Sequence, residues 1–496
     1  MLNCLVTIST DGSSMSFQIQ YSYAEQFAEA IQPIVASAQP SPASDPQWLA
    51  FNQQLATELG IPACWQMTTQ GLQLYAGNQL PDCLKPTALG YAGHQFGHFV
   101  PRLGDGRALL LAELATPAGT IIDVQLKGSG PTPFSRSGDG RAPLGPVLRE
   151  FLVSEAMHSM GIATTRALAA VSTGDWVYRE QALPGAVLTR VASSHLRVGT
   201  AQYIASFNDD ALTQQFADYV LARHYPECAN SAHPYQALYS AVIERQAALI
   251  AQWMSVGFIH GVMNTDNMTL SGETIDYGPC AFMEHYDPNA VFSAIDRAGR
   301  YAYKNQPAIA LWNLARLGEA WLPLMASDSQ QAVRCATELV QQFPRCYEQH
   351  YYALMGAKIG ITDIQPDDRD LIDQLLQIMA EQQLDYTNTL RWLANGELAT
   401  ETTLRAWQQR WLQRLSHQPL PLTAVYAAMN QRNPAVIPRN HWVQAAISQT
   451  LESGELTVFN DLMTVLRTPY AMPTTAPQYT QPATAEQRVS KTFCGT

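Results

Sequence analysis

The feature that most constrains the fold is a change of sequence pattern near residue 200. Residues 85–200 combine glycines with short apolar and β-branched runs, and RALLLAEL (107–114) and GTIIDVQLK (119–127) are typical of neighbouring strands. Beyond residue 200 the apolar residues recur at helical spacing, as in PYQALYSAVIERQAALIAQWMSVGF (234–258). Together these patterns predict an α+β fold, in which a β-rich unit precedes a larger helical unit.

Shifts in composition divide the chain into four parts. Residues 1–84 indicate an N-terminal extension, within which QWLAFNQQLATELG (47–60) predicts a helix that ends at a glycine. The β-rich unit spans residues 85–200 and the helical unit spans residues 201–465. Residues 466–496 are rich in Pro, Thr and Gln, so we expect them to be extended or loosely attached.

Two local patterns refine the β-rich unit. PLGPVLREFLVSEAMHSMGI (143–162) has apolar residues at helical spacing and predicts an amphipathic helix closed by Gly161. ALAAVSTGDWVYRE (167–180) predicts a strand, a turn at residues 173–175 and a second strand.

Charge and cysteine usage exclude several classes of protein. The net charge of −12 argues against a general nucleic-acid surface, and no apolar run approaches the roughly 20 residues that cross a bilayer. The eight cysteines form no C-x-x-C pair, which argues against a zinc ribbon or a disulfide scaffold and fits a reducing compartment. The first basic residue is Lys85, so no Arg-rich transit peptide is indicated. We therefore expect a cytoplasmic protein that binds neither nucleic acid nor membrane, with Cys494 an idle thiol.

The stretch HGVMNTDN (260–267) matches the protein-kinase loop H-R-D-L-x-x-x-N at its His and its Asn, but Val262 replaces the catalytic Asp. Asp266 is the nearest carboxylate that could act as a general base, although an Asp at this place could also cap the turn. Asp276 of IDYGP follows Asn267 by nine residues (276 − 267), as a kinase D-F-G Asp would. Asn267 and Asp276 together predict oxygen ligands for a Mg²⁺ that bridges phosphates, whereas D-Y-G alone would be a routine turn.

Residues upstream of this loop suit the binding of phosphates. Gly104 and Gly106 of RLGDGRALLL would let backbone amides approach an anion, although a glycine hairpin without a ligand explains them equally well. Lys127 ends a predicted strand as the kinase lysine does, and Glu150 follows 23 residues later (150 − 127) in the predicted helix. The alternative is that the two residues are unrelated surface charges. Their order on a strand and the next helix favours instead a Lys–Glu ion pair that orients the lysine.

Two arginines stand where a kinase does not require them. Arg190 and Arg197 in VLTRVASSHLRVG carry guanidinium groups that bind phosphate oxygens in bidentate fashion, and surface salt bridges are the alternative explanation. His94 and His98 in GHQFGH are four residues apart, but the Glu of a zinc H-E-x-x-H motif is missing. We interpret these histidines as loop supports and not as metal ligands.

Long stretches of the chain resemble the selenoprotein O (SelO) family, whose members have a protein-kinase-like fold. The resemblance runs from about residue 85 to beyond residue 320 and is carried by YAGHQFGHFVPRLGDGRALLLAEL, DVQLKGSGPTPFSRSGDGRAPLGPVLREFLVSEAMHSMGI, GFIHGVMNTDNMTLSGETIDYGPCAFME and YDPNAVFSAIDRAGRYAYKNQP. It implies a bilobal fold with a β-rich N-lobe, a helical C-lobe, an N-terminal extension and C-terminal helical additions.

The resemblance also implies an activity, a protein adenylyltransferase that moves AMP from ATP to Ser, Thr or Tyr hydroxyls of proteins, itself included, and releases pyrophosphate. In the family ATP is bound flipped relative to kinases, so that its α-phosphate meets the hydroxyl. Asp266 would then be the base, and Asn267 and Asp276 would hold Mg²⁺ or Mn²⁺. The same resemblance assigns the ATP pocket to Gly104, Gly106, Arg107, Lys127, Asp139, Gly140, Arg190, Arg197 and Asp276, with Glu150 orienting Lys127.

The chain departs from the family in one respect, and two other functions remain open. Many members have a Cys after the D-Y-G loop that can pair with a C-terminal Cys, but VFSAIDRAGRY (291–301) has none, and the sequence does not support a disulfide between Cys280 and Cys494. UTP could replace ATP as donor, because nothing in the sequence recognises the base. One alternative to AMP transfer is a protein kinase with a relocated base. The other is a catalytically inactive nucleotide-binding scaffold, which is suggested by Val262 in place of the kinase Asp.

Overall fold

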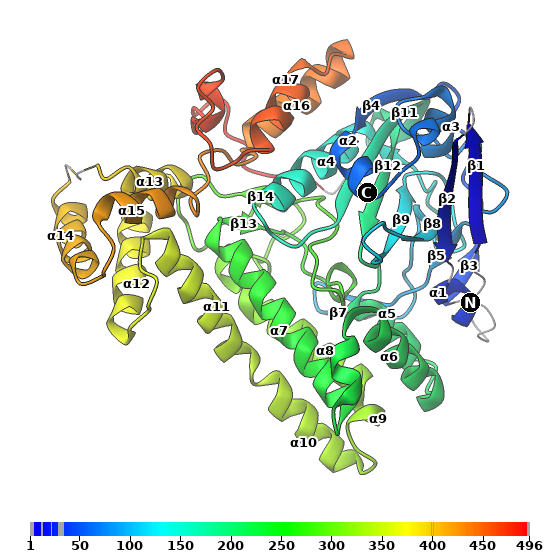
Figure 1. Cartoon of the computed structure of the whole chain (residues 1–496), viewed down its shortest axis with the longest axis horizontal. Coiled ribbons are helices and arrows are strands. Elements are labelled where there is room, and N and C mark those ends of the chain that lie inside the picture. Colours follow the sequence, from blue (N-terminus) through cyan, green and yellow to red (C-terminus); the bar gives the residue numbers. More distant parts are fainter. Residues whose placement is uncertain are drawn as a thin grey trace.

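The computed structural model describes residues 4–10, 13–20, 22–27, 34–397, 399 and 401–493. Over these residues the chain is a mixed α+β structure, with an antiparallel sheet on one side and helices in the C-terminal half (Figure 1). This arrangement confirms the predicted α+β class and the change of structure near residue 200.

The main sheet collects strands from widely separated stretches of the first 192 residues. Its order is β1-β2-β8-β9-β12-β11-β4, while β10 pairs with β12 and β5 pairs with both β3 and β8. The small pairs β6–β7 and β13–β14 lie outside it. The strands are β1 Cys4–Thr10, β2 Ser13–Gln20, β3 Val35–Ser37, β4 Gln47–Phe51, β5 Thr87–Leu89, β6 Gly93–Gln95, β7 His98–Val100, β8 Ala108–Ala115, β9 Ile121–Lys127, β10 Ala142–Pro143, β11 Arg166–Tyr178, β12 Ala182–Ala192, β13 Phe258–Ile259 and β14 Ala281–Phe282.

Residues 47–60 do not form the single helix that their apolar spacing predicts. Gln47–Phe51 is the edge strand β4 and pairs antiparallel with β11. Asn52 then begins the short helix α2, because its side chain accepts a hydrogen bond from Leu55 N and so caps the helix. Pairing with a distant strand therefore overrides the local helical pattern, and the first 84 residues contribute strands to the main sheet.

The turn predicted at residues 173–175 is a bulge within one long strand. β11 runs through this stretch, and its register against β12 shifts between Ser172 and Trp176. Gly174 has a φ of +75°, and a Cβ atom there would lie 2.7 Å from Cβ of Asp45. A glycine in this position is typical of a bulge as well as of a turn, which explains the wrong prediction.

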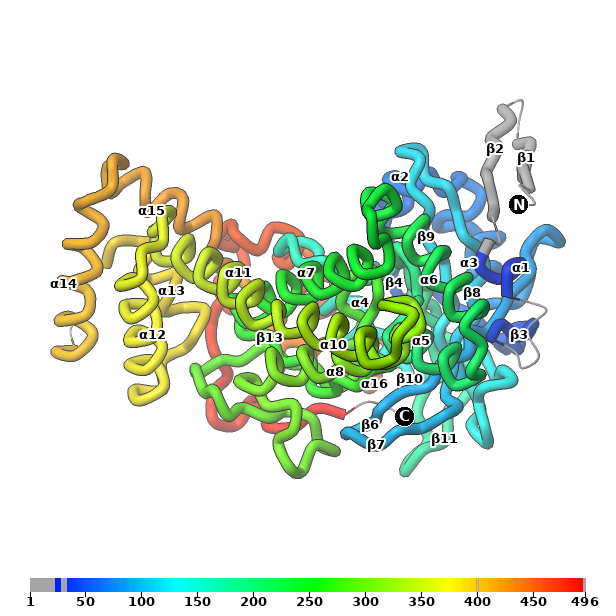
Figure 2. Tube along the Cα trace, turned by 90° about the horizontal axis from the view of Figure 1, so that it is seen from below, coloured from blue at the N-terminus to red at the C-terminus, as the bar shows by residue number. Residues whose placement is uncertain are grey.

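The helices form a bundle beside the sheet and a smaller group beyond it (Figures 1 and 2). The long helices α7 and α11 run side by side, and α12 to α15 lie farthest from the sheet. The helices are α1 Ser22–Phe27, α2 Gln53–Glu58, α3 Thr69–Tyr75, α4 Leu144–Ser159, α5 Val198–Ala205, α6 Asp210–His224, α7 Pro234–Ser255, α8 Gln306–Ala320, α9 Leu322–Met325, α10 Ser329–Val340, α11 Phe343–Lys358, α12 Pro366–Glu381, α13 Tyr386–Ala394, α14 Thr402–Ser416, α15 Leu422–Asn430, α16 Asn440–Ser453 and α17 Thr457–Leu466.

Helix α4 is the predicted amphipathic helix, and it ends before Gly161, whose φ is +78°. It packs on β11 and β12 and is covered from the other side by α16 and α17. Phe151 and Leu152 of α4 belong to the same buried cluster as Phe459 and Leu462 of α17. Each such buried side chain contributes roughly 1.5–3 kcal/mol, so the C-terminal helices hold in place the helix that carries Glu150.

The sequence predicts a C-terminal tail that is extended or loosely attached, but its described part includes the short 3₁₀ helix Pro477–Thr480 and is held against the rest of the protein. Tyr479 is buried, and the backbone of Thr492 exchanges hydrogen bonds with Phe292 and Ala294. The Thr492 side chain also donates to Pro279 O at 2.5 Å. Cys494 lies outside the described residues, so the prediction that it is an idle thiol is not tested.

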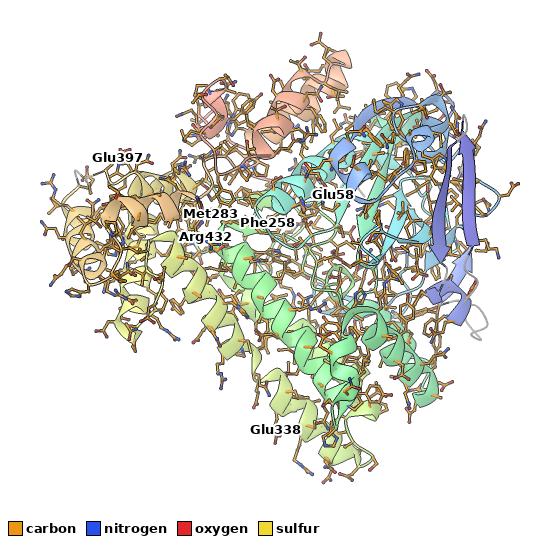
Figure 3. The ribbon with its side chains drawn as sticks, in the orientation of Figure 1. Glu58, Phe258, Met283, Glu338, Glu397 and Arg432 are labelled. Carbon is orange, nitrogen blue, oxygen red and sulfur yellow. The ribbon has the colours of Figure 1, made fainter. Side chains whose placement is uncertain are left out.

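Figure 3 labels Phe258 and Met283 where the pair β13–β14 meets the upper end of α7. Among the described residues, no helix has the length and the apolar character that crossing a membrane requires.

Candidate functional site

A cavity of about 390 Å³ lies between the sheet and the helical half, and most of the predicted site residues line it. Strand β9 contributes Lys127, helix α4 contributes Glu150, and β12 contributes Arg190. The loops around the short 3₁₀ helix at residues 265–267 supply the opposite wall. The predicted residues on the lining are Gly106, Arg107, Lys127, Glu150, Arg190, Arg197, Asp266, Asn267 and Asp276.

Three cations converge on the carboxylate of Asp276. Lys127 Nζ and Arg190 Nη1 each lie 2.7 Å from its Oδ1, and Arg197 Nη1 lies 2.7 Å from its Oδ2. Lys127 Nζ also lies 2.6 Å from Glu150 Oε2, which confirms the predicted Lys–Glu ion pair. We name Lys127, Arg190 and Arg197 the cation clamp. Their nitrogen atoms can serve phosphate oxygens as readily as carboxylate oxygens.

The backbone and the charge of Asp276 are both unusual. Its φ of +64° lies in the left-handed region that residues other than glycine rarely adopt. Burial acts to raise its pKa, but Lys127, Arg197 and Arg190 hold the pKa of Asp276 well below its ordinary value. Asp276 therefore keeps a full negative charge at neutral pH, as a metal ligand must.

Asp266 has the surroundings of a general base. Its side chain is buried, and its Oδ1 has no hydrogen-bond partner among the described residues. Burial raises the pKa of Asp266 to about 6, against the opposing effect of Arg197. A carboxylate with a pKa near the working pH is ionised in part and basic enough to accept a proton from a hydroxyl.

The loop of residues 260–267 is fixed by contacts within the core. His260 is buried, its Nε2 donates to Ile275 O at 2.9 Å, and its Nδ1 accepts from Val262 N at 3.4 Å. This pairing requires the neutral ring, and burial lowers the pKa of His260 accordingly. His260 thereby joins the loop of Asp266 to the residue that precedes Asp276.

Asn267 and Asp276 are the residues that could hold a Mg²⁺ or Mn²⁺ ion together with the phosphates of a bound nucleotide. Asn267 Nδ2 donates to Val262 O at 2.9 Å, which leaves its Oδ1 as the ligand atom. Within the described part of the chain, no group of three or more His, Cys, Asp or Glu side chains could hold a metal by itself. Mg²⁺ often takes only one or two protein oxygens and completes its shell with substrate phosphates and water, so this pair of donors is sufficient.

The remaining predicted residues line an adjoining cavity of about 430 Å³. Gly104, Asp139 and Gly140 border it together with Gly106 and Arg107, which border both cavities. Asp139 is exposed and forms an ion pair with Arg179 at 2.8 Å, and this contact lowers the pKa of Asp139. A Cβ atom on Gly140 would lie 2.0 Å from Gly130 O, so this turn requires glycine. Asp266 lies where the two cavities meet.

Asp105 lines the first cavity, and sequence reasoning missed it. It is buried, accepts hydrogen bonds from Leu89 N at 3.2 Å and Gln125 Nε2 at 3.1 Å, and lies 3.9 Å from Arg197 Nη2. Burial raises the pKa of Asp105 to about 6. The available signal was its position between Gly104 and Gly106, but an Asp between glycines is equally typical of an exposed turn.

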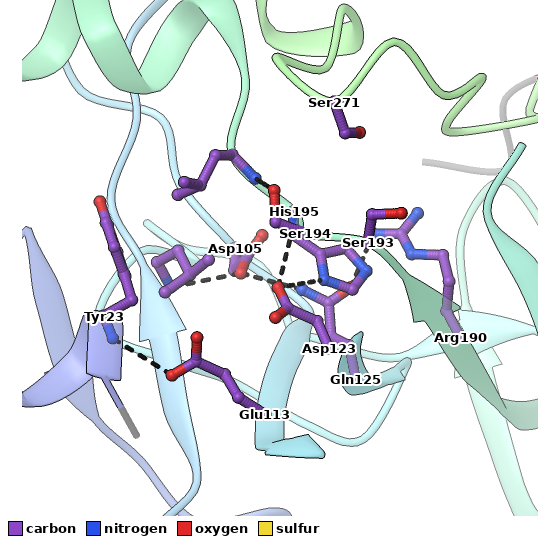
Figure 4. Close-up of polar contacts among 12 residues, drawn as sticks. Tyr23, Asp105, Glu113, Asp123, Gln125, Arg190, Ser193, Ser194, His195 and Ser271 are labelled. Atoms are coloured by element: carbon purple, nitrogen blue, oxygen red, sulfur yellow. Dashed lines mark hydrogen bonds and ion pairs between the residues drawn. The ribbon is translucent and has the colours of Figure 1, made fainter. Parts of the chain in front are cut away.

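A buried polar network supports the segment that carries Arg190 and Arg197 (Figure 4). Asp123 Oδ2 accepts from His195 N at 2.9 Å and lies 3.2 Å from His195 Nδ1. Arg223 joins Asp123 to Glu113, which in turn accepts from Tyr23 N at 3.1 Å. Burial lowers the pKa of His195 to about 4, so its ring is neutral. The cation clamp is thus tied to the sheet by groups that do not line the cavity.

His94 and His98 lie on the two strands of the hairpin β6–β7. His94 Nδ1 is 2.9 Å from Gln202 Nε2, and its ring contacts those of Phe99 and Trp312. His98 is exposed on the other strand. The neighbouring Gln95, which the sequence did not single out, contacts Asp266 directly.

Comparison with known proteins gives one family. The family model described as protein adenylyltransferase SelO matches residues 18–467. A protein nucleotidyltransferase YdiU of Anoxybacillus flavithermus is 51% identical over 458 residues, which cover 92% of this chain and 95% of the relative. Proteins of the same name from Rhizobium leguminosarum bv. trifolii and Alkaliphilus metalliredigens are 48% and 51% identical, covering 99% and 92% of this chain and 99% and 94% of the relatives.

Proposed function

Because the chain belongs to the SelO family of protein adenylyltransferases, and is therefore a nucleotidyltransferase, we propose that it transfers AMP from ATP to Ser, Thr or Tyr hydroxyls of proteins. The observation that carries this proposal is the cation clamp, in which three cations meet one carboxylate inside a cavity. A kinase exports its γ-phosphate and needs no such set of cations. An enzyme that releases pyrophosphate must bind both outer phosphates while the α-phosphorus reacts.

The reaction requires little covalent chemistry from the protein. The acceptor oxygen bonds to the α-phosphorus, its proton passes to Asp266, and the bond between the α-phosphorus and the bridging oxygen of pyrophosphate breaks. Lys127, Arg190 and Arg197 hold the outer phosphates of an ATP bound in the flipped orientation and stabilise the negative charge that grows on the leaving group. Glu150 keeps Lys127 in place through their ion pair.

A divalent ion at Asn267 and Asp276, Mg²⁺ or Mn²⁺, would supply further charge neutralisation on the phosphates. The adjoining cavity that Gly104, Gly106, Arg107, Asp139 and Gly140 border would accommodate the rest of the nucleotide. UTP is a second possible donor, which would make the reaction UMP transfer.

We further propose that the sheet region and the helical half are the two lobes of a protein-kinase-like fold. In that assignment the N-terminal extension is 1–84, the N-lobe 85–200, the helical C-lobe 201–465 and the tail 466–496. The chain order of Lys127, Glu150, Asn267 and Asp276 supports it. A cytoplasmic location is proposed from the free thiols of Cys64, Cys228, Cys335 and Cys346, which suit a reducing compartment.

Parallel incubation with α-labelled and γ-labelled ATP tests the proposal. We expect incorporation of the α label alone into protein acceptors and into the enzyme itself. Incorporation of the γ label would show a kinase with a relocated base, and binding of ATP without incorporation of either label would show a scaffold. Mass spectrometry of the modified proteins would identify the acceptor residue as Ser, Thr or Tyr.

A further inference from the structure

The hairpin β6–β7 is separate from the main sheet and packs against the loop that carries Asp266. Its strands pair Gly93 with Val100 and Gln95 with His98. His94 N donates to Thr265 Oγ1 at 2.7 Å, and Phe96 N donates to Asn264 Oδ1 at 3.1 Å. The main chain on both sides of Gln95 is therefore attached to the two residues that precede Asp266.

A second set of contacts makes this attachment rigid. Gln202 bridges the two elements, because its Oε1 accepts from Thr265 Oγ1 at 2.7 Å and its Nε2 lies 2.9 Å from His94 Nδ1. Tyr301 donates to Asn264 Oδ1 at 2.6 Å and packs against Phe96. The hairpin is thus held against the loop of Asp266 by both main-chain and side-chain contacts, as an element that orients a reacting group requires.

Two residues of β6 lie against the two oxygens of the Asp266 carboxylate. Gln95 Nε2 donates to Oδ2 at 3.3 Å. On the other side, a Cβ atom at Gly93 would lie 2.5 Å from Oδ1, so only glycine leaves room for this oxygen. The backbone of Gly93 does not have a positive φ, so space and not backbone conformation requires glycine here.

The two oxygens consequently differ in their surroundings. Oδ2 accepts from Gln95, whereas Oδ1 is buried without a hydrogen-bond partner in the described residues. A carboxylate oxygen has two lone pairs, so the bond from Gln95 fixes the carboxylate and still leaves it a free lone pair for a proton. Gln95 is neutral, so its amide can orient the carboxylate without lowering its pKa as strongly as a nearby Lys or Arg would, and the carboxylate stays basic.

We propose that Gln95 is a positioning residue for the general base, which holds the carboxylate of Asp266 in the orientation from which it takes the proton of the acceptor hydroxyl. This inference rests on the proposed function, because it concerns the base of that reaction. Gln95 acts through Asp266, so its replacement should slow the transfer step without a loss of nucleotide affinity.

Two variants test it in different ways. Gln95→Met keeps the length of the side chain but removes the donor, and Gly93→Ala keeps Gln95 but displaces Oδ1. Each should lower the transfer rate at saturating α-labelled ATP by about 10-fold to 100-fold, the range that misplacement of a reacting group produces. Binding of a non-hydrolysable ATP analogue with Mg²⁺, measured by calorimetry, should stay within about twofold of wild type, since neither change alters the cation clamp.

The control is His98→Ala on the paired strand, which is exposed and should leave the rate unchanged. Undiminished transfer in both variants would overturn the inference while the proposed function stands. Weaker analogue binding with an unchanged saturated rate would also overturn it, since Gln95 would then be a nucleotide contact. If Gln95→Met unfolds in a thermal melt, Gly93→Ala alone decides. Failure of the wild type to incorporate the α label would instead remove the proposed function, and this inference with it.

Discussion

The guanidinium of Arg197 donates to the main-chain oxygen of Asp266 at 2.6 Å, so the cation clamp and the candidate base are in direct contact. The same Nη1 reaches Asp276 Oδ2 at 2.7 Å, and the guanidinium stacks 4.7 Å from the ring centroid of Tyr91. One planar cation therefore contacts the loop of the candidate base, the carboxylate of Asp276 and the wall of the cavity together.

Replacing Arg197 by Lys should impair both binding and transfer. A lysine keeps the charge, but its compact ammonium cannot make these contacts at once or stack on Tyr91. We expect the rate of α-label transfer to fall by about 10-fold or more and ATP-analogue affinity to fall as well. Arg369→Lys, in an exposed ion pair with Glu348, is the matched control. Wild-type kinetics for Arg197→Lys would show that charge alone suffices.

Asp266→Asn should abolish the base while preserving the shape of the site. General-base catalysis contributes about 10²-fold to 10⁴-fold, so single-turnover transfer should slow by that factor while the ATP analogue still binds. Asp210→Asn, an exposed residue of α6, is the control. If Asp266→Asn retained the wild-type rate, another group would have to take the proton and Asp266 would only cap its turn.

Asp276→Asn should destabilise the ligand-free protein and make it more responsive to polyphosphate. Removing this carboxylate leaves Arg197 and Arg190, both buried, with fewer negative partners, and breaking a buried ion pair costs about 3 kcal/mol. Inorganic triphosphate without divalent metal should then raise the melting temperature of the variant more than that of wild type, because its oxygens can take the place of the lost carboxylate. An equal response in both proteins would contradict the cation clamp as a phosphate site.

Motif spacing predicted the site residues that follow one another in a fixed order on successive strands, helices and loops. Lys127 ends a strand, Glu150 follows in the next helix, and their ion pair forms at 2.6 Å as the spacing indicates. Asn267 and Asp276 come from two loops in succession, and both line the cavity. These relationships depend on local structure and chain order, which a sequence pattern records.

Contacts between distant segments could not be predicted in the same way. Gln95 reaches Asp266 across 171 residues, and nothing in the local pattern of GHQFGH distinguishes it from an ordinary polar side chain. Residues 47–51 form a strand because their backbone pairs with β11, although the spacing of their apolar residues favours a helix. The packing of α17 on α4 likewise depends on the fold of everything between them. Such pairings follow from tertiary packing, which overrides local propensity.

Lys358 gives a prediction about stability that is independent of the site. This residue ends α11, is only 4% exposed, and donates to Arg432 O at 3.2 Å. The salt bridges of the described residues include no partner for it, and burial lowers the pKa of Lys358 from 10.5 to about 7. Between these two values the unfolded chain binds a proton that the folded protein does not, so folding stability must rise with pH across this window.

Lys358→Met should remove this dependence, because methionine fills similar space without a titratable group. In wild type the uptake of one proton on unfolding makes the unfolding free energy rise by at most about 1.4 kcal/mol per pH unit. Below about pH 7 Lys358 is protonated in both the folded and the unfolded state, so this pH dependence disappears. Urea denaturation of both proteins from about pH 7 to about pH 9.5 should therefore show a smaller increase of stability for the variant. Lys304→Met, at an exposed position, should behave as wild type. Parallel curves for wild type and Lys358→Met would mean that Lys358 remains charged in the folded protein.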